Sequence, residues 1–429
     1  MANALSGTAG SVAYITGGTT AVGSIKEWSL SLTHNPVETT AFADVWQTYI
    51  ASIRGATGSF SGNGDINDSA HTSLRNAMIG GSAVALRFYN GPDYYWEAGT
   101  AYLTGNERSI SNDGKLELSY DFTVSGAIIY NSLWLHNGTW SVGIDSLSNS
   151  PTLGSEILTN GNFETWTSAT NAGTWAESLT GTSTVNQETS VVNSGSNACR
   201  LDVDGSASDV FVSQTTGSTI GAWYLFSYYV KSNPTGKQIK TFLGAVSGQT
   251  RTITTTYTQY SESYRAVGSN ASIGIERAGS ASSSLYVDDA SFKLLTLNTL
   301  FTVKQGSANP STVGAGCTIG SAGCHGGVVY GLDSYTAPTT FILAIHDGVS
   351  TLQMLKCVSG TYTSLVSATV THVAGARIQI VFTGSNTYQL WYNGTQRGTD
   401  QTVSDAGTGI YHGAFSTNAS NTISGFVIT

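Results

Sequence analysis

Residues 23–62 read GSIKEWSLSLTHNPVETTAFADVWQTYIASIRGATGSFSG, and this stretch decides how the N-terminal part of the chain folds. Trp28, Leu30 and Leu32 alternate with polar residues, which is the pattern of a strand buried on one face. The alternation then stops, and a second short strand is expected only at 58–62. A connection this long inside a compact domain is uncommon and is usually functional or disordered.

The long connection carries three aromatic side chains, Phe42, Trp46 and Tyr49. Disordered segments are poor in such residues, so we expect the connection to be ordered. Because it has no core of its own, we expect it to pack on something else, such as another subunit. The alternative is that Trp46 and Tyr49 fold back into the core of their own domain.

The composition is typical of an all-β chain with many turns. The 429 residues include 50 glycines and only 10% charged residues, and apolar residues with helical periodicity are nearly absent. The net charge of −9 gives no basic footprint for tight nucleic-acid binding. We expect no signal peptide, because the N-terminus lacks basic and apolar regions, and no membrane span, because no run of about 18 apolar residues occurs.

Residues 1–128 are expected to form one β-sandwich or barrel with a single short helix. The helix is predicted at 68–79, where Asn67 or Asp68 can cap its start and Gly80 can end it. Further strands are predicted at 83–89, 94–104 and 115–124, and the last shows the clearest alternation of apolar and polar residues.

The order of these elements resembles that of phage major tail tube proteins. The resemblance is carried by SIKEWSLSL, VETTAFADVWQTYIASIRGATGSFSG, DSAHTSLRNAMIGG and AYLTGNERSISNDGKLELSYDFTVSGAI. It implies a subunit of hexameric rings that stack into a hollow tube for DNA, with strands of six subunits merging into one inner barrel. It also implies that a loop over residues 37–54 reaches the adjacent ring, with Val37, Phe42, Trp46, Tyr49 and Arg54 as its candidate contacts.

Acidic residues outnumber basic ones in this first domain. A conduit for DNA should repel phosphate rather than grip it, so DNA is expected to pass without specific binding. Glu117 and Asp121, on the polar side of the last strand, are candidates for the wall of the lumen. The alternative for each is an ordinary solvated surface position.

Residues 129–155 form a junction whose end has the composition of a linker. Its start contains large apolar side chains, including Trp134 and Trp140, which would be costly to expose at roughly 2 kcal/mol each. We expect them to pack on a neighbouring domain as an added strand.

Residues 156–296 are expected to form a second β-domain. Its opening NGNFE and its closing LYVDDASFKLL resemble carbohydrate-binding modules of the galactose-binding-like jelly-roll type. In such modules the two ends meet and often hold a structural calcium ion, for which Glu164, Asp288 and Asp289 are the candidates here. Because adjacent residues of a strand point to opposite faces, at most one of the two Asp is expected to be a ligand. The alternative is a polar edge without metal, and no cofactor is required. Trp175 and Trp223 are candidates for stacking on a sugar, as are Tyr224, Tyr228 and Tyr229, although most of these rings are expected to be core.

Residues 297–429 are expected to form a third β-domain, in which strands end at turns such as 346–348. The stretch RIQIVFTGSNTYQLWYNGTQRGT resembles concanavalin-like or laminin-G-like jelly rolls, in which a strand ends in an exposed hairpin. Asn393-Gly394 is a strong signal for a type I′ turn in that hairpin. Trp391, just before the turn, is the third tryptophan that is a candidate for stacking on a glycan.

No catalytic residues are predicted, and we expect the chain not to be an enzyme. A glycosidase would need paired carboxylates, whereas the few acids of the third domain form no such cluster. The histidines lack metal-ligand spacing, and no nucleophile elbow is present. Cys317 and Cys324 are close enough in sequence to form a disulfide across a glycine-rich loop, or to remain free thiols.

These features predict a structural virion protein, a tail tube subunit that carries two outer β-sandwich domains able to contact cell-surface glycans. Its partners would be copies of itself and other tail proteins, and it would be located in the virion tail after assembly in the host cytoplasm. A long non-contractile, siphovirus-like tail is favoured, because two extra domains would collide with a close-fitting sheath. The alternative is a multidomain cell-surface adhesin or lectin without a tube.

Overall fold

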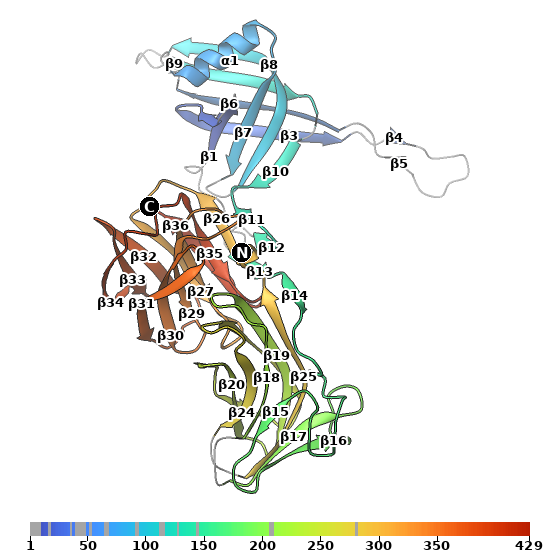
Figure 1. The fold of residues 1–429 in the computed structure, drawn as a ribbon. Coiled ribbons are helices and arrows are strands. Elements are labelled where there is room, and N and C mark those ends of the chain that lie inside the picture. The colour runs from blue at the N-terminus through green and yellow to red at the C-terminus, as the bar shows by residue number, and fades with distance from the viewer. Residues whose placement is uncertain are drawn as a thin grey trace, which may run out of the picture. The chain divides into compact units, whose positions relative to one another are not determined.

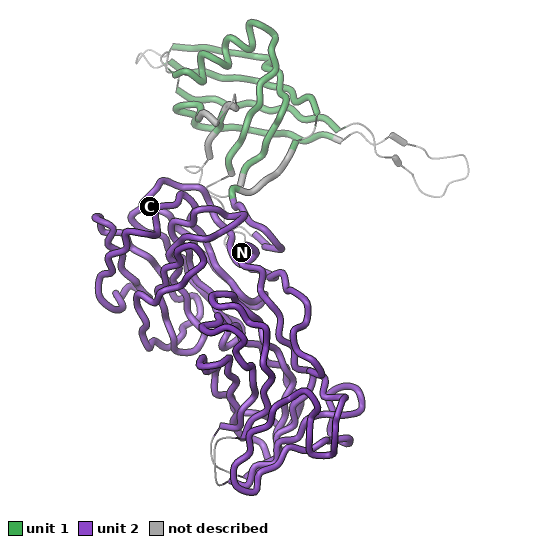
Figure 2. Tube along the Cα trace, viewed as in Figure 1, with its two compact units in different colours: residues 1–133 green, residues 134–429 purple. Residues whose placement is uncertain are grey.

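Every strand pairing in the computed structural model is antiparallel, and α1 (Ser69–Ile79) is the only α-helix among the described residues. Those residues are 10–15, 19–34, 37–38, 49–50, 54–63, 68–90, 94–110, 116–126, 128–142, 146–205, 210–278 and 282–429. The chain divides into two compact units, residues 1–133 and 134–429 (Figures 1 and 2). The predicted all-β fold with one short helix is confirmed.

The sheet of the first unit is built around one long strand, β8 (Tyr94–Ile110). Its first half pairs with β7 (Val84–Asn90) along one edge and with β10 (Ile128–Ser132) along the other, and its second half pairs with β9 (Leu116–Val124). Beyond β9 follow β6 (Arg54–Asn63) and β3 (Ile25–His34), and beyond β7 follow β1 (Gly10–Ile15) and β2 (Thr19–Ala21). Because β1 also contacts β3, the sheet folds over one core.

The core of the first unit comes from the apolar side of this sheet and from α1. The rings of Phe60, Tyr120, Phe88 and Phe122 pack together, with centroids 5.0–6.4 Å apart. The predicted cap of the helix is confirmed, since the Asp68 carboxylate accepts the backbone N–H groups of the first helical turn. The same carboxylate accepts the N–H of Gly23 at 2.8 Å, which ties the start of the helix to the start of β3.

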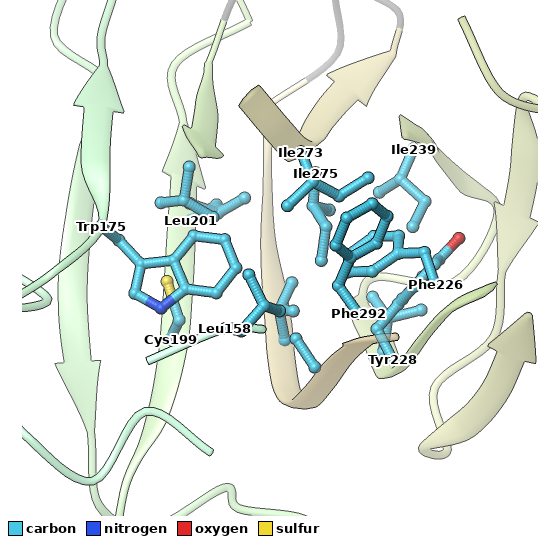
Figure 3. Packing of buried hydrophobic residues seen from close by; sticks show 14 of the residues in the cluster. Leu158, Trp175, Cys199, Leu201, Phe226, Tyr228, Ile239, Ile273, Ile275 and Phe292 are labelled. Atoms are coloured by element: carbon cyan, nitrogen blue, oxygen red, sulfur yellow. The ribbon is translucent and has the colours of Figure 1, made fainter. Parts of the chain in front are cut away.

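The first sandwich of the second unit has two sheets around a large apolar cluster, part of which Figure 3 shows. One sheet, the β25 sheet, contains β16 (Thr184–Glu188), β17 (Ala198–Val203), β25 (Ser283–Leu295), β19 (Trp223–Asn233) and β23 (Thr258–Arg265), with β14 (Leu153–Glu156) on β25. The other, the β24 sheet, contains β15 (Ala176–Ser178), β18 (Phe211–Thr215), β24 (Ser272–Ala278), β20 (Lys237–Leu243) and β21 (Val246–Ser247), with β22 (Arg251–Ile253) on β20.

The second sandwich of this unit also has two sheets. We call one the covered sheet: β11 (Leu135–His136), β26 (Phe301–Gln305), β35 (Tyr411–Ser416), β28 (Gly326–Leu332), β29 (Phe341–His346), β30 (Thr351–Val358) and β31 (Thr361–Thr369). We call the other the open sheet: β12 (Thr139–Val142), β13 (Ser146–Ser150), β36 (Thr422–Ile428), β27 (Thr312–Thr318), β32 (Ala376–Gly384), β33 (Thr387–Tyr392) and β34 (Thr395–Thr402). A short 3-10 helix, Leu297–Leu300, precedes β26.

The start of the junction behaves as expected, because its apolar residues join sheets. β11 adds to the covered sheet and the β12–β13 hairpin to the open sheet, while β14 adds to the first sandwich. Trp134 and Trp140 are buried, and the indole N–H of Trp140 donates to the Thr299 carbonyl at 3.0 Å. The prediction that this segment packs as added strands is confirmed.

The covered sheet is buried on both faces. Its inner face contributes to the core shared with the open sheet, and its outer face packs on Trp223 and Leu295 from the first sandwich. All six residues of β29 are therefore buried: Ile342 and Ala344 belong to the core shared with the open sheet, whereas Phe341, Leu343 and Ile345 pack on the side of the first sandwich.

Candidate functional sites

One face of the first unit is made almost entirely of hydroxyl and carboxylate side chains. Outward-facing positions of β3, β6, β9 and the second half of β8 lie in register across four strands, as in the row Ser29, Ser59 and Asp121. We call this surface the polar face, and its members are Lys26, Glu27, Ser29, Ser31, Thr33, Thr57, Ser59, Ser61, Glu107, Ser109, Glu117, Ser119, Asp121 and Thr123.

The polar face is negatively charged. It carries four carboxylates, Glu27, Glu107, Glu117 and Asp121, and one ammonium group, Lys26, whose Nζ lies 3.1 Å from Glu117 Oε1. Both groups of this ion pair are more than half exposed, so the pair adds little to stability. Glu117 and Asp121, the residues predicted for the lumen, both project from this exposed face.

The polar face has an unpaired edge on each side among the described residues, at β3 and at the second half of β8. β3 is the last strand of the sheet and pairs only with β6. On the opposite side, β7 pairs with β8 only as far as Ala101, so residues 102–110 of β8 pair with β9 alone. Such edges present rows of backbone N–H and C=O groups that can pair with another chain.

The predicted inter-ring loop is described in part. Val37 and Tyr49 belong to β4 (Val37–Glu38) and β5 (Tyr49–Ile50), which pair as a small two-stranded sheet. Arg54 begins β6 and is exposed. Phe42 and Trp46 lie outside the described residues.

The three carboxylates predicted to bind calcium are brought to one loop, residues 193–197. Asp288 Oδ2 accepts the backbone N–H groups of Asn193 and Ser194, at 2.8 and 3.2 Å. Asp289 accepts the side chains of the same two residues, each at 2.8 Å. Glu164 Oε1 accepts two further backbone N–H groups of the loop at 2.8 and 3.0 Å. Gly195 has a φ of +66°, and a Cβ there would meet Glu164 Oε1 at 2.0 Å.

Hydrogen bonds to these carboxylates replace the ligand set that calcium would need. Calcium takes about six to eight oxygen ligands, whereas here N–H and O–H donors occupy the carboxylate oxygens. Within the described ranges, no group of three or more acidic, histidine or cysteine side chains could hold a metal ion. Burial raises the pKa of Asp288 to about 6, against the effect of the backbone N–H groups of Asn193, Ser194 and Asp289, which lower it. The arrangement fits a loop, residues 193–197, that is held in place by hydrogen bonds to the carboxylates, rather than a cation site.

Two of the three tryptophans predicted to stack on a sugar are core residues. Trp175 is 4% exposed and stacks on Phe163 at 5.0 Å between centroids (Figure 3 labels Trp175 within the core). Trp223 is 2% exposed, where it packs against the covered sheet and donates its indole N–H to the Tyr362 hydroxyl at 3.2 Å. A ring without an exposed face cannot stack on a sugar, so neither remains a candidate. Trp391 is half-buried on the outer face of the open sheet.

The contact between the two sandwiches holds a Ser–His–Asp group that the sequence did not indicate. Ser263 Oγ lies 2.7 Å from His325 Nδ1, and Asp347 lies nearby. Ser263 is only 3% exposed, and Thr417 also donates to its Oγ. Asp347 Oδ1 accepts backbone N–H groups of its own turn, and its Oδ2 accepts the Gln249 amide. These contacts fasten one sandwich to the other.

Two further findings concern the cysteines and the helices of the described residues. Cys317 and Cys324 are buried free thiols, the second of the two alternatives that the sequence left open. No helix in the described part of the chain is long and apolar enough to cross a membrane.

No protein-family model and no curated protein matches the chain. Among solved structures, the tail of an empty gene transfer agent (GTA) particle is 13% identical, with a TM-score of 0.28 over 30% of this chain and 99% of that chain. The SPP1 tail tube is 13% identical, with a TM-score of 0.26 over 30% of this chain and 80% of that one.

A third match is the CBM22-1 xylan-binding domain of Paenibacillus barcinonensis Xyn10C. It is 12% identical, with a TM-score of 0.25 over 35% of this chain and 98% of that domain. Similarity at this level establishes no family membership for the chain.

Proposed function

We propose that the chain is a structural virion protein whose first unit is a subunit of stacked hexameric rings forming a tail tube. The observation that carries the proposal is the polar face, a four-stranded surface of hydroxyls and carboxylates whose two edges are unpaired within the described part of the chain. Four strands from each of six subunits would close into one inner barrel, because pairing edge to edge leaves no strand unpaired.

The chemistry of the polar face suits the wall of a DNA conduit. Four carboxylates and one ammonium group leave an excess of negative charge, which repels phosphate at the short distances where salt does not screen it. Its serines and threonines are short and neutral, so they keep water at the wall without gripping the DNA backbone. DNA would therefore pass without specific binding.

The loop over residues 37–54 is proposed to contact the next ring. It leaves from the ends of β3 and β6, two strands of the proposed barrel, and its small β4–β5 pair is separate from the main sheet. Replacing both Phe42 and Trp46 by Ser should weaken the stacking of rings more than the folding of the subunit. Loss of the cooperative melt in this double variant would instead place both rings in the subunit's own core.

The second unit is proposed to decorate the outside of a long non-contractile tail in the virion, and to bind cell-surface glycans without catalysis. Many weakly binding copies along one tube would give useful avidity. No metal or cofactor is proposed. Assembly would take place in the host cytoplasm with other tail proteins. The second candidate, a multidomain adhesin or lectin, would use the same glycan-binding domains without a tube.

Negative-stain electron microscopy of the purified full chain tests this proposal. Stacked rings with a central channel are expected. Formation of these rings should require the free edge of β3. A Pro introduced for the exposed Leu32, whose backbone N–H points away from β6, removes one backbone donor from that edge and should prevent ring closure. Separate monomers of the unaltered chain at every protein and salt concentration would favour the adhesin.

A further inference from the structure

The two sheets of the second sandwich differ in whether their outer face is covered by another part of the chain that the structure describes. The outer face of the covered sheet is buried against the first sandwich, whereas the open sheet presents Arg377, Gln379, Gln389, Trp391 and Gln396 on its outer side. We propose that this surface, centred on Trp391, binds a neutral pyranose unit of a polysaccharide. The inference rests on the proposed decoration role of the second unit and assigns its binding site.

Trp391 is held in a fixed orientation by a chain of polar contacts. Its indole Nε1–H donates to Gln389 Oε1 at 2.9 Å, and Gln389 Nε2 donates to Asp400 Oδ1 at 2.9 Å. Gln396 Nε2 donates to the same carboxylate oxygen at 2.8 Å. Preorganised side chains lose less conformational entropy when a ligand binds, which favours affinity for a small ligand.

Amide side chains flank the ring on both neighbouring strands. Trp391 pairs with Gln379 of β32 on one side and with Gln396 of β34 on the other, and directly paired side chains lie about 5 Å apart. Beyond Gln379 the next strand, β27, carries Gly314, where a Cβ would come within 2.6 Å of Gln379 Cγ. The glycine therefore lets the Gln379 side chain lie over β27 instead of over the indole.

This set of groups matches the two kinds of surface on a pyranose. The C–H face of the sugar would stack on the indole, while its hydroxyls would bond to the amides and the carboxylate. In the described residues, the Gln379 amide, Gln396 Oε1 and Asp400 Oδ2 have no protein hydrogen-bond partner and remain available. The single guanidinium, Arg377, balances the single carboxylate, so the surface favours a neutral saccharide over a charged one.

A protein partner is less well matched to this surface. Protein interfaces have an apolar core surrounded by a polar rim. Among the described residues, none of the exposed large apolar side chains comes from β32, β33 or β34. An aromatic ring with amides around it is suited to an amphipathic sugar rather than to a large apolar patch.

The test is titration calorimetry of the full chain with neutral hexasaccharides of β-1,4-glucan, α-1,4-glucan, β-1,3-glucan, β-1,4-mannan and β-1,4-galactan, beside hexagalacturonate. At least one neutral probe should bind, and the acidic one more weakly. Trp391→Ala should weaken binding at least about tenfold, as loss of a stacking ring does elsewhere. Trp391→Phe, which keeps a smaller ring, should give an intermediate loss, and Asp400→Ala a loss of about threefold or more.

Phe211→Ala is the matched control. Phe211 is also half-buried on the outer face of a sheet, where it packs edge-on against Phe242 at 5.3 Å, but it belongs to the other sandwich. Its removal should leave saccharide binding unchanged. If circular dichroism shows that Trp391→Ala does not fold, Asp400→Ala, which changes an exposed residue, tests the binding site instead. The proposal would be overturned if no neutral probe binds the unaltered chain. It would also be overturned if the Trp391 or Asp400 variant binds as tightly as the unaltered chain, or if the Phe211 variant loses binding.

Microscopy of the same samples separates this inference from the tube. Tubes that form but bind sugar independently of Trp391 would refute the site and leave the tube intact. Trp391-dependent binding by a chain that forms no rings would refute the tube and leave the site intact.

Discussion

Acid should destabilise the second sandwich of the second unit through His412. This side chain is 0% exposed on β35. Its Nδ1 accepts the backbone N–H of Gly331 at 3.1 Å, so the ring proton is on Nε2, which lies 3.1 Å from the Ser307 carbonyl oxygen. A second proton would remove the only acceptor on the ring and bury a charge. Burial accordingly lowers the pKa of His412 to about 4.

The size of the effect follows from proton linkage. An unfolded histidine has a pKa of about 6.5, so between pH 6.5 and 4 the unfolded state binds more protons than the folded state at this position. The free energy of unfolding must therefore fall as the pH falls through this window. At pH 5, one and a half units below the unfolded value, the loss is about 2 kcal/mol, at about 1.36 kcal/mol per unit.

Urea unfolding of the full chain and of His412→Asn, at several pH values between 7.5 and 5, measures this term. The stability advantage of the unaltered chain over the variant should shrink by about 2 kcal/mol across the range. Groups common to both proteins cancel in the difference, including Asp288, whose raised pKa acts in the opposite direction. Val329→Ala, a buried apolar change in the same sheet, should keep the unaltered pH slope. A difference independent of pH would refute the reasoning.

Three further outcomes are expected. Trp223→Ala should cost the second unit about 3–5 kcal/mol and lower the melting temperature of both its sandwiches by circular dichroism, since the ring packs in the core between them; an unchanged melt would count against that shared core. Chelation with EDTA should leave the melting temperature unchanged, while Asp288→Ala should cost about 1–3 kcal/mol, because two backbone N–H groups lose their acceptor; a rise in melting temperature on adding calcium would contradict this. Glu117→Lys with Asp121→Lys should give tubes that retain duplex DNA at low salt in a co-sedimentation assay, and failure to retain it would argue that these positions face away from the lumen.

Local pattern predicted β7 and β9 of the first unit well, because each of these strands has one apolar and one polar side. In β9 the buried residues Leu118, Tyr120, Phe122 and Val124 are those that the alternation assigned to the core. The Asn393-Gly394 turn is confirmed by φ values of +48° and +77°, which a type I′ turn requires. Both features are determined by residues that lie close together in the sequence, so the sequence alone is enough to predict them.

The candidate sites were harder to predict, because they depend on contacts between distant segments. Nothing near Trp223 in the sequence reveals that another sandwich, more than a hundred residues away, will cover its ring. The oxygen-rich positions Glu164 and Asp288 were correctly brought together, but the sequence did not reveal that backbone N–H groups of residues 193–197 would occupy their oxygens. Trp391 is half-buried and stays a candidate, because it lies on the outer face of β33 together with Gln389.

The central claim is that the polar face of the first unit lines the channel of a six-fold tube. Cryo-electron microscopy of assemblies of the purified chain, with enough detail to trace strands, measures this directly. The account predicts stacked hexameric rings in which β3, β6, β9 and the second half of β8 form the inner wall, with Glu117 and Asp121 facing the channel. Rings whose channel is lined by another part of the chain, or an assembly without six-fold rings, would contradict it.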